Sequence, residues 1–158
     1  MSPDDYTPHS GDRRYRVEHY DLRIDYRLGS NRLDGVALVH GRVLEPTKSI
    51  SLDLVGLRAT KVQAPRGGAG KGGRIGFTQT DRKLKVAFGR ELAPGDPFEL
   101  AVSYGGAPRP RRTRWGTLGW EELEDGAIVA SQPIGAPSWF PCNDHPGDKA
   151  TYRLTVTR

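Results

Sequence analysis

Hydrophobic and polar side chains alternate along several stretches of the chain. In residues 20–28 every second side chain is apolar, and the side chains between them are charged. A strand directs successive side chains to opposite faces, so this pattern predicts a half-buried β-strand with one face in water. A helix would scatter the same apolar groups around its circumference. The apolar members are Tyr20, Leu22, Ile24, Tyr26 and Leu28.

The same period of two recurs in further segments that are separated by Gly, Pro, Asn and Asp. Short strands between such turn residues are typical of an antiparallel all-β domain. No segment keeps a helical period for more than two turns. The sequence therefore predicts the all-β class, with the other strands at residues 36–43, 50–54, 84–88, 98–104 and 152–156.

Three segments lack this alternation. Residues 1–14 have no apolar periodicity and contain two prolines, which indicates a flexible tail. Residues 65–74 are basic and rich in Gly, and we interpret them as a flexible loop between two strands. Residues 105–125 are predicted to form an irregular loop in which Trp115 and Trp120 are packing anchors.

A fourth irregular segment, residues 133–146, is rich in aromatic and amide side chains. Its four prolines exclude regular ladder pairing over most of its length. Asn143 and Asp144 are suited to bind the polar groups of an irregular backbone. We therefore expect an ordered crossing that leads into the last strand.

Length and charge limit the class of protein. A chain of 158 residues is typical of a single domain with its own core. No stretch approaches the roughly 18 apolar residues that a membrane span needs, so we expect no membrane contact. The single cysteine, Cys142, is typical of a reducing compartment, which predicts a cytoplasmic protein. The net charge of +5 indicates solubility and is not by itself evidence for a nucleic-acid partner.

The spacing of the histidines and the cysteine matches no known catalytic or metal-binding motif. The four histidines include no H-E-x-x-H and there is no C-x-x-C, so the sequence predicts no metal site. Cys142 stands three residues before His145, but a buried, inert thiol is the preferred interpretation over a nucleophile.

Basic side chains cluster between Arg109 and Arg114, beside Trp115, which is one way to bind single-stranded nucleic acid. Acidic side chains follow at residues 121–125 and would cancel the local positive field, so we expect no nucleic-acid partner. Gly70 and Lys71 are followed by Gly72 rather than Ser or Thr, so the Gly-rich segment does not fit a phosphate-binding loop.

Residues 140–152 read Phe-Pro-Cys-Asn-Asp-His-Pro-Gly-Asp-Lys-Ala-Thr-Tyr. Every fixed position matches F-P-C-x-D-x-P-x-x-K-A-x-F/Y, so the segment resembles the signature of the aminopeptidase N family of zinc metallopeptidases (gluzincin aminopeptidases). The sequence of this segment looks most like that of the actinobacterial-type branch of the family. The resemblance implies a structural role for Phe140, Pro141, Cys142, Asp144, Pro146, Lys149 and Ala150.

The resemblance covers residues 15–158. It implies a saddle-like antiparallel β-domain or sandwich, which is the N-terminal domain of an enzyme that removes N-terminal amino acids from peptides. In that family, zinc is held by H-E-x-x-H and a downstream Glu, and G-x-M-E-N binds the substrate amine. Neither motif occurs here. We therefore expect a C-terminally truncated chain that lacks the catalytic domain, holds no cofactor and is inactive alone; zinc belongs to the intact enzyme.

The resemblance also implies a substrate-binding role for Gln132, which stands nine residues before Pro141. The family has Glu or Gln there, and this residue contacts the free amine at the N-terminus of the peptide. Two residues earlier the family often has a Gln that lines the first specificity pocket, where this chain has Ala130. The side-chain preference of the parent enzyme therefore stays open.

A second hypothesis involves no enzyme. Trp115, Trp120 and Trp139 lie in predicted loops, a pattern that also fits a stand-alone β-sandwich module that binds peptides or carbohydrates. Under either hypothesis the last predicted strand ends at Arg158 without a further neighbour. Because unpaired strand edges promote association, we expect the isolated chain to be marginally stable or to aggregate.

Overall fold

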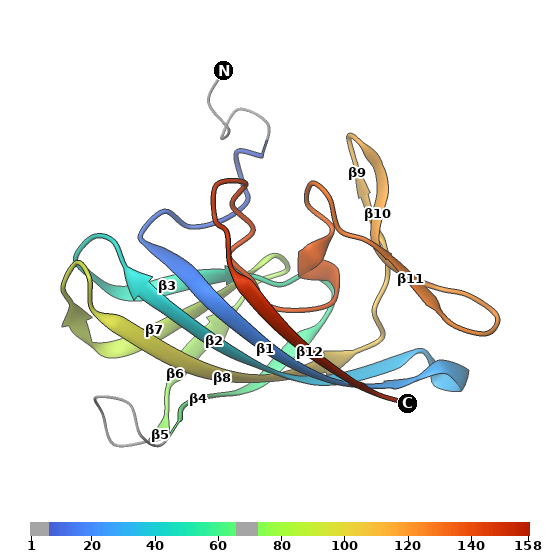
Figure 1. Cartoon of the computed structure of the whole chain (residues 1–158), viewed down its shortest axis with the longest axis horizontal. Coiled ribbons are helices and arrows are strands. Elements are labelled where there is room, and N and C mark those ends of the chain that lie inside the picture. Colours follow the sequence, from blue (N-terminus) through green and yellow to red (C-terminus); the bar gives the residue numbers. More distant parts are fainter. Residues whose placement is uncertain (1–6, 66–72) are drawn as a thin grey trace.

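The structure is a computed structural model that describes residues 7–65 and 73–158. Two curved sheets face each other, and a third, smaller sheet projects from them as an arm (Figure 1). The six-stranded sheet has the order β12 (Thr151–Thr157), β1 (Tyr15–Arg27), β2 (Arg32–Val43), β8 (Pro97–Gly106), β4 (Arg58–Ala64) and β5 (Gly73–Arg74).

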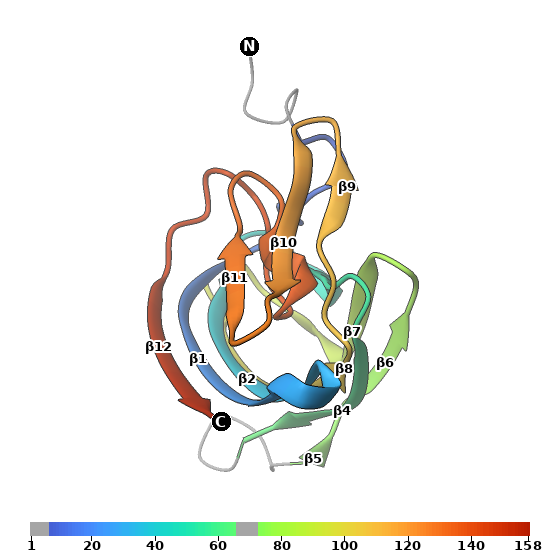
Figure 2. The same cartoon turned by 90° about the vertical axis from the view of Figure 1, so that its right-hand side faces the viewer.

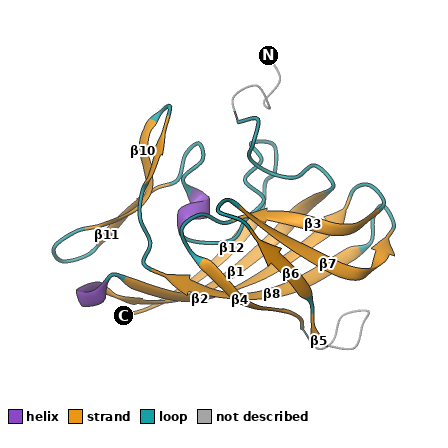
Figure 3. Ribbon diagram, turned by 180° about the vertical axis from the view of Figure 1, so that it is seen from behind, coloured by secondary structure: helices purple, strands orange, loops and turns teal. Residues whose placement is uncertain are grey.

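The second sheet has the order β3 (Thr47–Asp53), β7 (Lys83–Leu92) and β6 (Gly76–Gln79). The arm has the order β11 (Ala127–Ala130), β10 (Gly116–Glu122) and β9 (Arg111–Thr113). Within the described ranges the helical elements are two 3-10 helices, Leu28–Ser30 and Ala136–Ser138, drawn in purple in Figure 3. None of the described helices is long and apolar enough to cross a membrane. The all-β prediction is confirmed.

The core lies between the six-stranded sheet and the β3–β7–β6 sheet, and the larger sheet curls around it (Figure 2). The predicted alternation in β1 is confirmed, because Leu22 and Ile24 are buried and Arg23 is exposed. The β2–β8 register sets Val39 opposite Leu100, and both side chains are fully buried. Apolar pairs of this kind across neighbouring strands are the main stabilising unit of a sheet.

One strand pair departs from the predicted antiparallel arrangement. β12 lies parallel to β1, with Tyr152 opposite Tyr20 and Leu154 opposite Leu22. A parallel neighbour requires a long crossover rather than a hairpin. Residues 131–150 lie between the arm and β12 and bring the chain to the outer side of β1 in the same direction as β1 (Figure 1).

Residues 7–14 differ from the flexible tail that the sequence predicts for residues 1–14. The Asp12 carboxylate accepts a hydrogen bond of 2.8 Å from the backbone N–H of Ser51, and the Asp12 N–H donates to Asn143 Oδ1 at 2.8 Å. Thr7 is buried. This segment is held by polar contacts. Such contacts require no periodic spacing of apolar residues, so the sequence pattern does not predict them. Residues 1–6 lie outside the described part of the chain.

Residues 105–125 also differ from the predicted irregular loop, because β9 and β10 form a hairpin there. Gly116, at the turn, has a φ of +107°, a region that favours glycine. The Thr113 hydroxyl donates to the Gly116 carbonyl at 2.7 Å and closes the turn. The predicted loop at residues 65–74 lies mostly outside the described residues, and its last two residues form β5.

Candidate functional site

The signature segment is fastened to β3 through Asp53. The backbones of Asp53 and Cys142 form an isolated antiparallel bridge, with N–H to carbonyl distances of 2.7 and 3.0 Å. The buried Asp53 carboxylate accepts from Lys83 Nζ at 2.6 Å, from the N–H of Gly11 at 2.9 Å and from the N–H of Asp144 at 3.0 Å. Asp53 therefore joins the N-terminal segment, β7 and the signature into one polar junction.

Asn143 fixes the signature from the other side. Its amide nitrogen donates to the Tyr15 carbonyl at 3.2 Å and to Asp148 Oδ2 at 3.0 Å. Its backbone N–H donates to the Tyr20 hydroxyl at 2.9 Å. Asp148 in turn accepts from the N–H of Val17 at 3.1 Å, beside the bulge in β1. The predicted hydrogen bonding of this irregular backbone by Asn143 is confirmed.

Asp144 has the most unusual acid–base environment of the signature. Burial and the negative charge of Asp53 raise the pKa of its carboxyl group to about 7, against the opposing effect of the cations Arg111 and Lys83. Its Oδ2 atom is buried and has no hydrogen-bond partner within the described ranges. The backbone of Asp144 serves the junction, while its carboxyl group is half-ionised near neutral pH.

Cys142 is the buried, inert thiol that the sequence analysis prefers. It is 3% exposed, and burial raises the pKa of its thiol well above the ordinary value. Because the thiolate is the reactive form of cysteine, both effects oppose a nucleophilic role beside His145.

An aromatic cluster surrounds Phe140. Its ring packs edge-on against Tyr20 at 5.5 Å between centroids and against Trp139 at 4.4 Å. Trp139 continues the cluster to Trp120 at 6.1 Å, and Trp120 packs against Tyr26 at 4.9 Å. The cluster ties the base of the arm to the inner face of the large sheet.

Gln132 is exposed on the loop that follows β11, and Ala130 is the exposed last residue of β11. Ser131, the residue before Gln132, is held by two hydrogen bonds. The N–H of Gly135 donates to the Ser131 carbonyl at 2.6 Å, and Trp139 Nε1 donates to Ser131 Oγ at 3.2 Å. Gln132 thus follows a residue that is fixed by hydrogen bonds.

The rest of the signature leads into β12. Pro141 is buried, Ala150 packs against the core, and Pro146 and Lys149 are exposed. The structural role that the resemblance implies for these residues stays a prediction.

Zinc does not fit the described part of this chain. No group of three or more His, Cys, Asp or Glu side chains is placed to hold a metal ion in residues 7–65 and 73–158. The rings of His19 and His40 lie 5.8 Å apart between centroids, and His40 Nε2 lies 3.5 Å from Glu99 Oε1.

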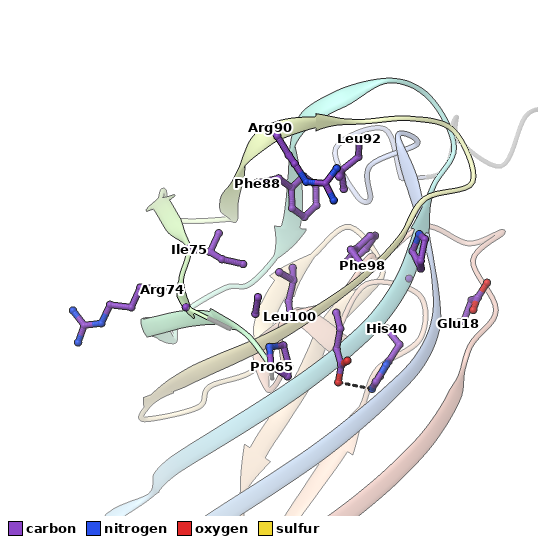
Figure 4. A pocket seen from close by; sticks show the side chains of 15 residues that line it. Glu18, His40, Pro65, Arg74, Ile75, Phe88, Arg90, Leu92, Phe98 and Leu100 are labelled. Atoms are coloured by element: carbon purple, nitrogen blue, oxygen red, sulfur yellow. Dashed lines mark ion pairs between the residues drawn. The ribbon is translucent and has the colours of Figure 1, made fainter. Parts of the chain in front are cut away.

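A cavity of about 460 Å³ lies at the end of the two facing sheets (Figure 4). Phe88, Phe98 and Leu100 contribute apolar side chains to its lining (Figure 4), and His40 and Glu99 also line it. None of the predicted site residues lines this cavity. It is therefore separate from the signature and from Gln132.

The positions of the three tryptophans do not match the exposed binding surface that the second hypothesis requires. Trp120 is 8% exposed and Trp139 is partly buried in the aromatic cluster. Trp115 is 38% exposed, and the Arg114 guanidinium stacks on it at 4.2 Å from the ring centroid. Of the two predicted packing anchors, Trp120 is confirmed and Trp115 is wrong. A ligand platform made of all three indole rings is not present.

Sequence reasoning missed the central position of Asp53. Asp53 stands at a polar position of the alternating sequence, between the buried Leu52 and Leu54. The alternation therefore predicts that its side chain is exposed to solvent. It is buried because the signature segment crosses over it. No local signal in the sequence distinguishes it from Ser49 or Ser51.

The fold and the junction define an all-β domain that carries an exposed loop after β11. The family model described as peptidase M1 N-terminal domain matches residues 16–158. The chain therefore belongs to the peptidase M1 N-terminal domain family, and the resemblance to the zinc aminopeptidases is confirmed.

Relatives and solved structures agree with this family. Aminopeptidase Q from Acinonyx jubatus is 28% identical over 160 residues, which cover 87% of this chain and 16% of the relative. The crystal structure of an M1 zinc metallopeptidase from Deinococcus radiodurans superposes with a TM-score of 0.86 at 33% identity, and covers 99% of this chain and 35% of that one. A mutant of that enzyme bound to a Tyr-Ser-Ala substrate has a TM-score of 0.85 at 32% identity, with the same coverage. This chain thus spans a minor part of each.

Proposed function

We propose that this domain is the substrate-side domain of an M1-type aminopeptidase and that Gln132 accepts a hydrogen bond from the N-terminal ammonium group of the peptide. The observation that carries the proposal is the position of Gln132, exposed on a fixed loop nine residues before Pro141. A zinc ion in the catalytic part of the enzyme supplies the Lewis acid. This domain contributes binding and orientation.

The chemistry of Gln132 fits this task. Its amide oxygen is a neutral acceptor and binds an ammonium group more weakly than a carboxylate does. Ala130, two residues earlier on the same edge, offers only a methyl group. Ala130 therefore contributes no polar contact to the first specificity pocket.

The catalytic part is also the proposed partner of two apolar surfaces. Tyr152, Leu154 and Val156 on β12 are each more than half exposed, although they share a sheet face with the core residues of β1. Ile128 on the arm is 55% exposed. Exposed apolar patches of this kind mark surfaces that a partner covers. A cytoplasmic location is part of the proposal and is supported by the single free thiol.

The test uses a chimera in which this chain replaces the matching part of the Deinococcus radiodurans M1 zinc metallopeptidase. We expect Gln132→Ala to raise KM for aminoacyl substrates by about tenfold, the value of one charge-assisted hydrogen bond. Gln63→Ala, which removes an amide on β4, is the matched control and should leave KM unchanged. Equal KM values for Gln132→Ala and the unsubstituted chimera would contradict the role of Gln132.

The isolated chain is the second arm of the test. We expect no turnover of aminoacyl-nitroanilides when it is supplied with zinc, because the described residues include no metal-binding group. Measurable turnover that survives chromatography with the chain would contradict the non-catalytic role.

A further inference from the structure

A cavity of about 350 Å³ lies at the base of the arm, where β9 approaches the segment that begins at Thr7 and the turn before β7. Its lining is strongly basic, and among the lining residues are Arg82, Arg111 and Arg112. The ion pairs found within the described ranges include none of these three guanidinium groups. This volume accommodates one or two amino-acid side chains.

The one carboxylate in the lining does not neutralise the arginines. Asp53 is already bound by Lys83 Nζ at 2.6 Å and by the N–H groups of Gly11 and Asp144. Burial and the charge of Arg82 lower the pKa of Arg111, while the negative charges of Asp144 and Asp53 act in the opposite direction. An anion placed between Arg82 and Arg111 would offset the repulsion between their guanidinium groups.

Two groups in the lining have hydrogen-bonding capacity to spare. Arg111 Nη1 donates to the Ile134 carbonyl at 3.0 Å, which leaves further N–H groups of a guanidinium that has five. The Thr7 hydroxyl is buried in the lining and has no hydrogen-bond partner in the described part of the chain. A buried hydroxyl without a partner costs free energy that a bound acceptor would recover.

The acidic side chains of the arm begin at Glu121 on β10. The register of β9 and β10 sets Arg111 opposite Leu118, so Glu121 lies three residues further along the strand, roughly 10 Å from that pair. This separation is close to the Debye length of about 8 Å at physiological salt, so the effect of these charges on the cavity is partly screened.

We infer that this cavity is a subsite for a carboxylate group of the peptide substrate, held by Arg111 and Arg82. The inference rests on the proposed peptidase function, because Ile134, which binds Arg111, lies two residues after Gln132. Two residues separate their Cα atoms by at most about 7 Å, so a peptide with its amine at Gln132 reaches Arg111 within a few extended residues.

A nucleic-acid strand fits this site less well than a peptide carboxylate. Binding of single strands relies on a continuous groove with several stacking aromatic rings. Trp115 is the one exposed tryptophan of the arm, and Arg114 already stacks on it. A half-open site with guanidinium and hydroxyl donors is suited to a planar carboxylate.

The experiment is an NMR titration of the whole chain with the peptide Ala-Ala-Glu-amide and its neutral match Ala-Ala-Gln-amide, in which the Glu side chain is the single carboxylate. We expect the Glu peptide to bind about tenfold more tightly, the value of one charge-assisted hydrogen bond, with shifts at the amides of residues 111–115. Arg111→Gln should remove this preference. Arg82→Gln, at an exposed turn, tests the same site with less risk to folding, and Arg109→Gln is the matched control that keeps the preference.

Three results would overturn the inference. They are equal affinity of the unsubstituted chain for the two peptides, a Glu preference that survives both Arg111→Gln and Arg82→Gln, and tighter binding of a single-stranded oligonucleotide than of the Glu peptide at the same salt concentration. The titration needs no catalytic part. A Glu preference without an effect of Gln132→Ala on the chimera would contradict the proposed function alone, and the reverse outcome would contradict this subsite alone.

Discussion

Replacing Asp144 by Asn removes a carboxyl group that the fold holds in an unfavourable place. Burial and the charge of Asp53 raise its pKa from 3.8 to about 7 in the folded protein, whereas the unfolded chain restores the ordinary value. Between these two pKa values the folded state binds more protons than the unfolded state. The contribution of Asp144 to the free energy of unfolding therefore falls as the pH rises from about 4 to about 8.

The size of the effect follows from the two pKa values. A pKa of about 7 in place of 3.8 corresponds to about 4 kcal/mol once the carboxyl group is fully ionised. The variant lacks this pH-dependent loss. The difference in unfolding free energy between Asp144→Asn and the wild-type chain should therefore shift by about 4 kcal/mol in favour of the variant between about pH 4 and about pH 8.

The assay is urea unfolding followed by tryptophan fluorescence at several pH values. Groups that are common to both chains and do not interact with Asp144, such as the partly buried Asp148, cancel in the difference. Asp125→Asn, at an exposed position, is the control and should show a difference that does not change with pH. A difference for Asp144→Asn that stays constant within about 0.5 kcal/mol would refute the reasoning, because no group with a raised pKa would then have been removed.

Three further substitutions or reactions test the junction and the arm. Asp53→Ala leaves Lys83 and two N–H groups without their acceptor; since the Lys83 side chain is 31% exposed, we expect a loss of about 3 kcal/mol in urea unfolding, against less than about 0.5 kcal/mol for Asp125→Ala. Cys142 should react with a thiol reagent only as fast as the chain unfolds, and rapid reaction under native conditions would contradict its burial. Gly119→Ala should lower the melting temperature with a cost of about 1–3 kcal/mol, because Gly119 has a φ of +122° and an added Cβ meets the Ser138 side chain; an unchanged melting temperature would show that the arm has room to adjust.

The strands of the core could be predicted from the sequence because each has one dry and one wet face. Residues 20–28 alternate without interruption, and β1 covers nearly all of them. The direction of pairing carries no such signal. The alternation in β12 is equally compatible with a parallel and an antiparallel neighbour, so its parallel pairing with β1 follows from the path of residues 131–150.

Segments held by polar contacts were the least predictable. Residues 7–14 lack an apolar pattern, yet Gly11 and Asp12 bind groups that are more than 35 residues away in the sequence. The arm is rich in Gly and Arg, which suggests a loop, but its backbone pairs with itself. The signature motif identified the family, and the backbones of two of its fixed residues, Cys142 and Asp144, form part of the junction. The acceptor that they bind, Asp53, could not be found from its own surroundings.

The position of the substrate amine relative to Gln132 tests the central claim most directly. The measurement is a crystal structure of the chimera with the peptide Tyr-Ser-Ala bound. The account predicts that Gln132 Oε1 lies about 3 Å from the amine nitrogen of the peptide, within hydrogen-bond distance. A bound peptide whose amine is surrounded by other groups, while Gln132 points into solvent, would contradict it.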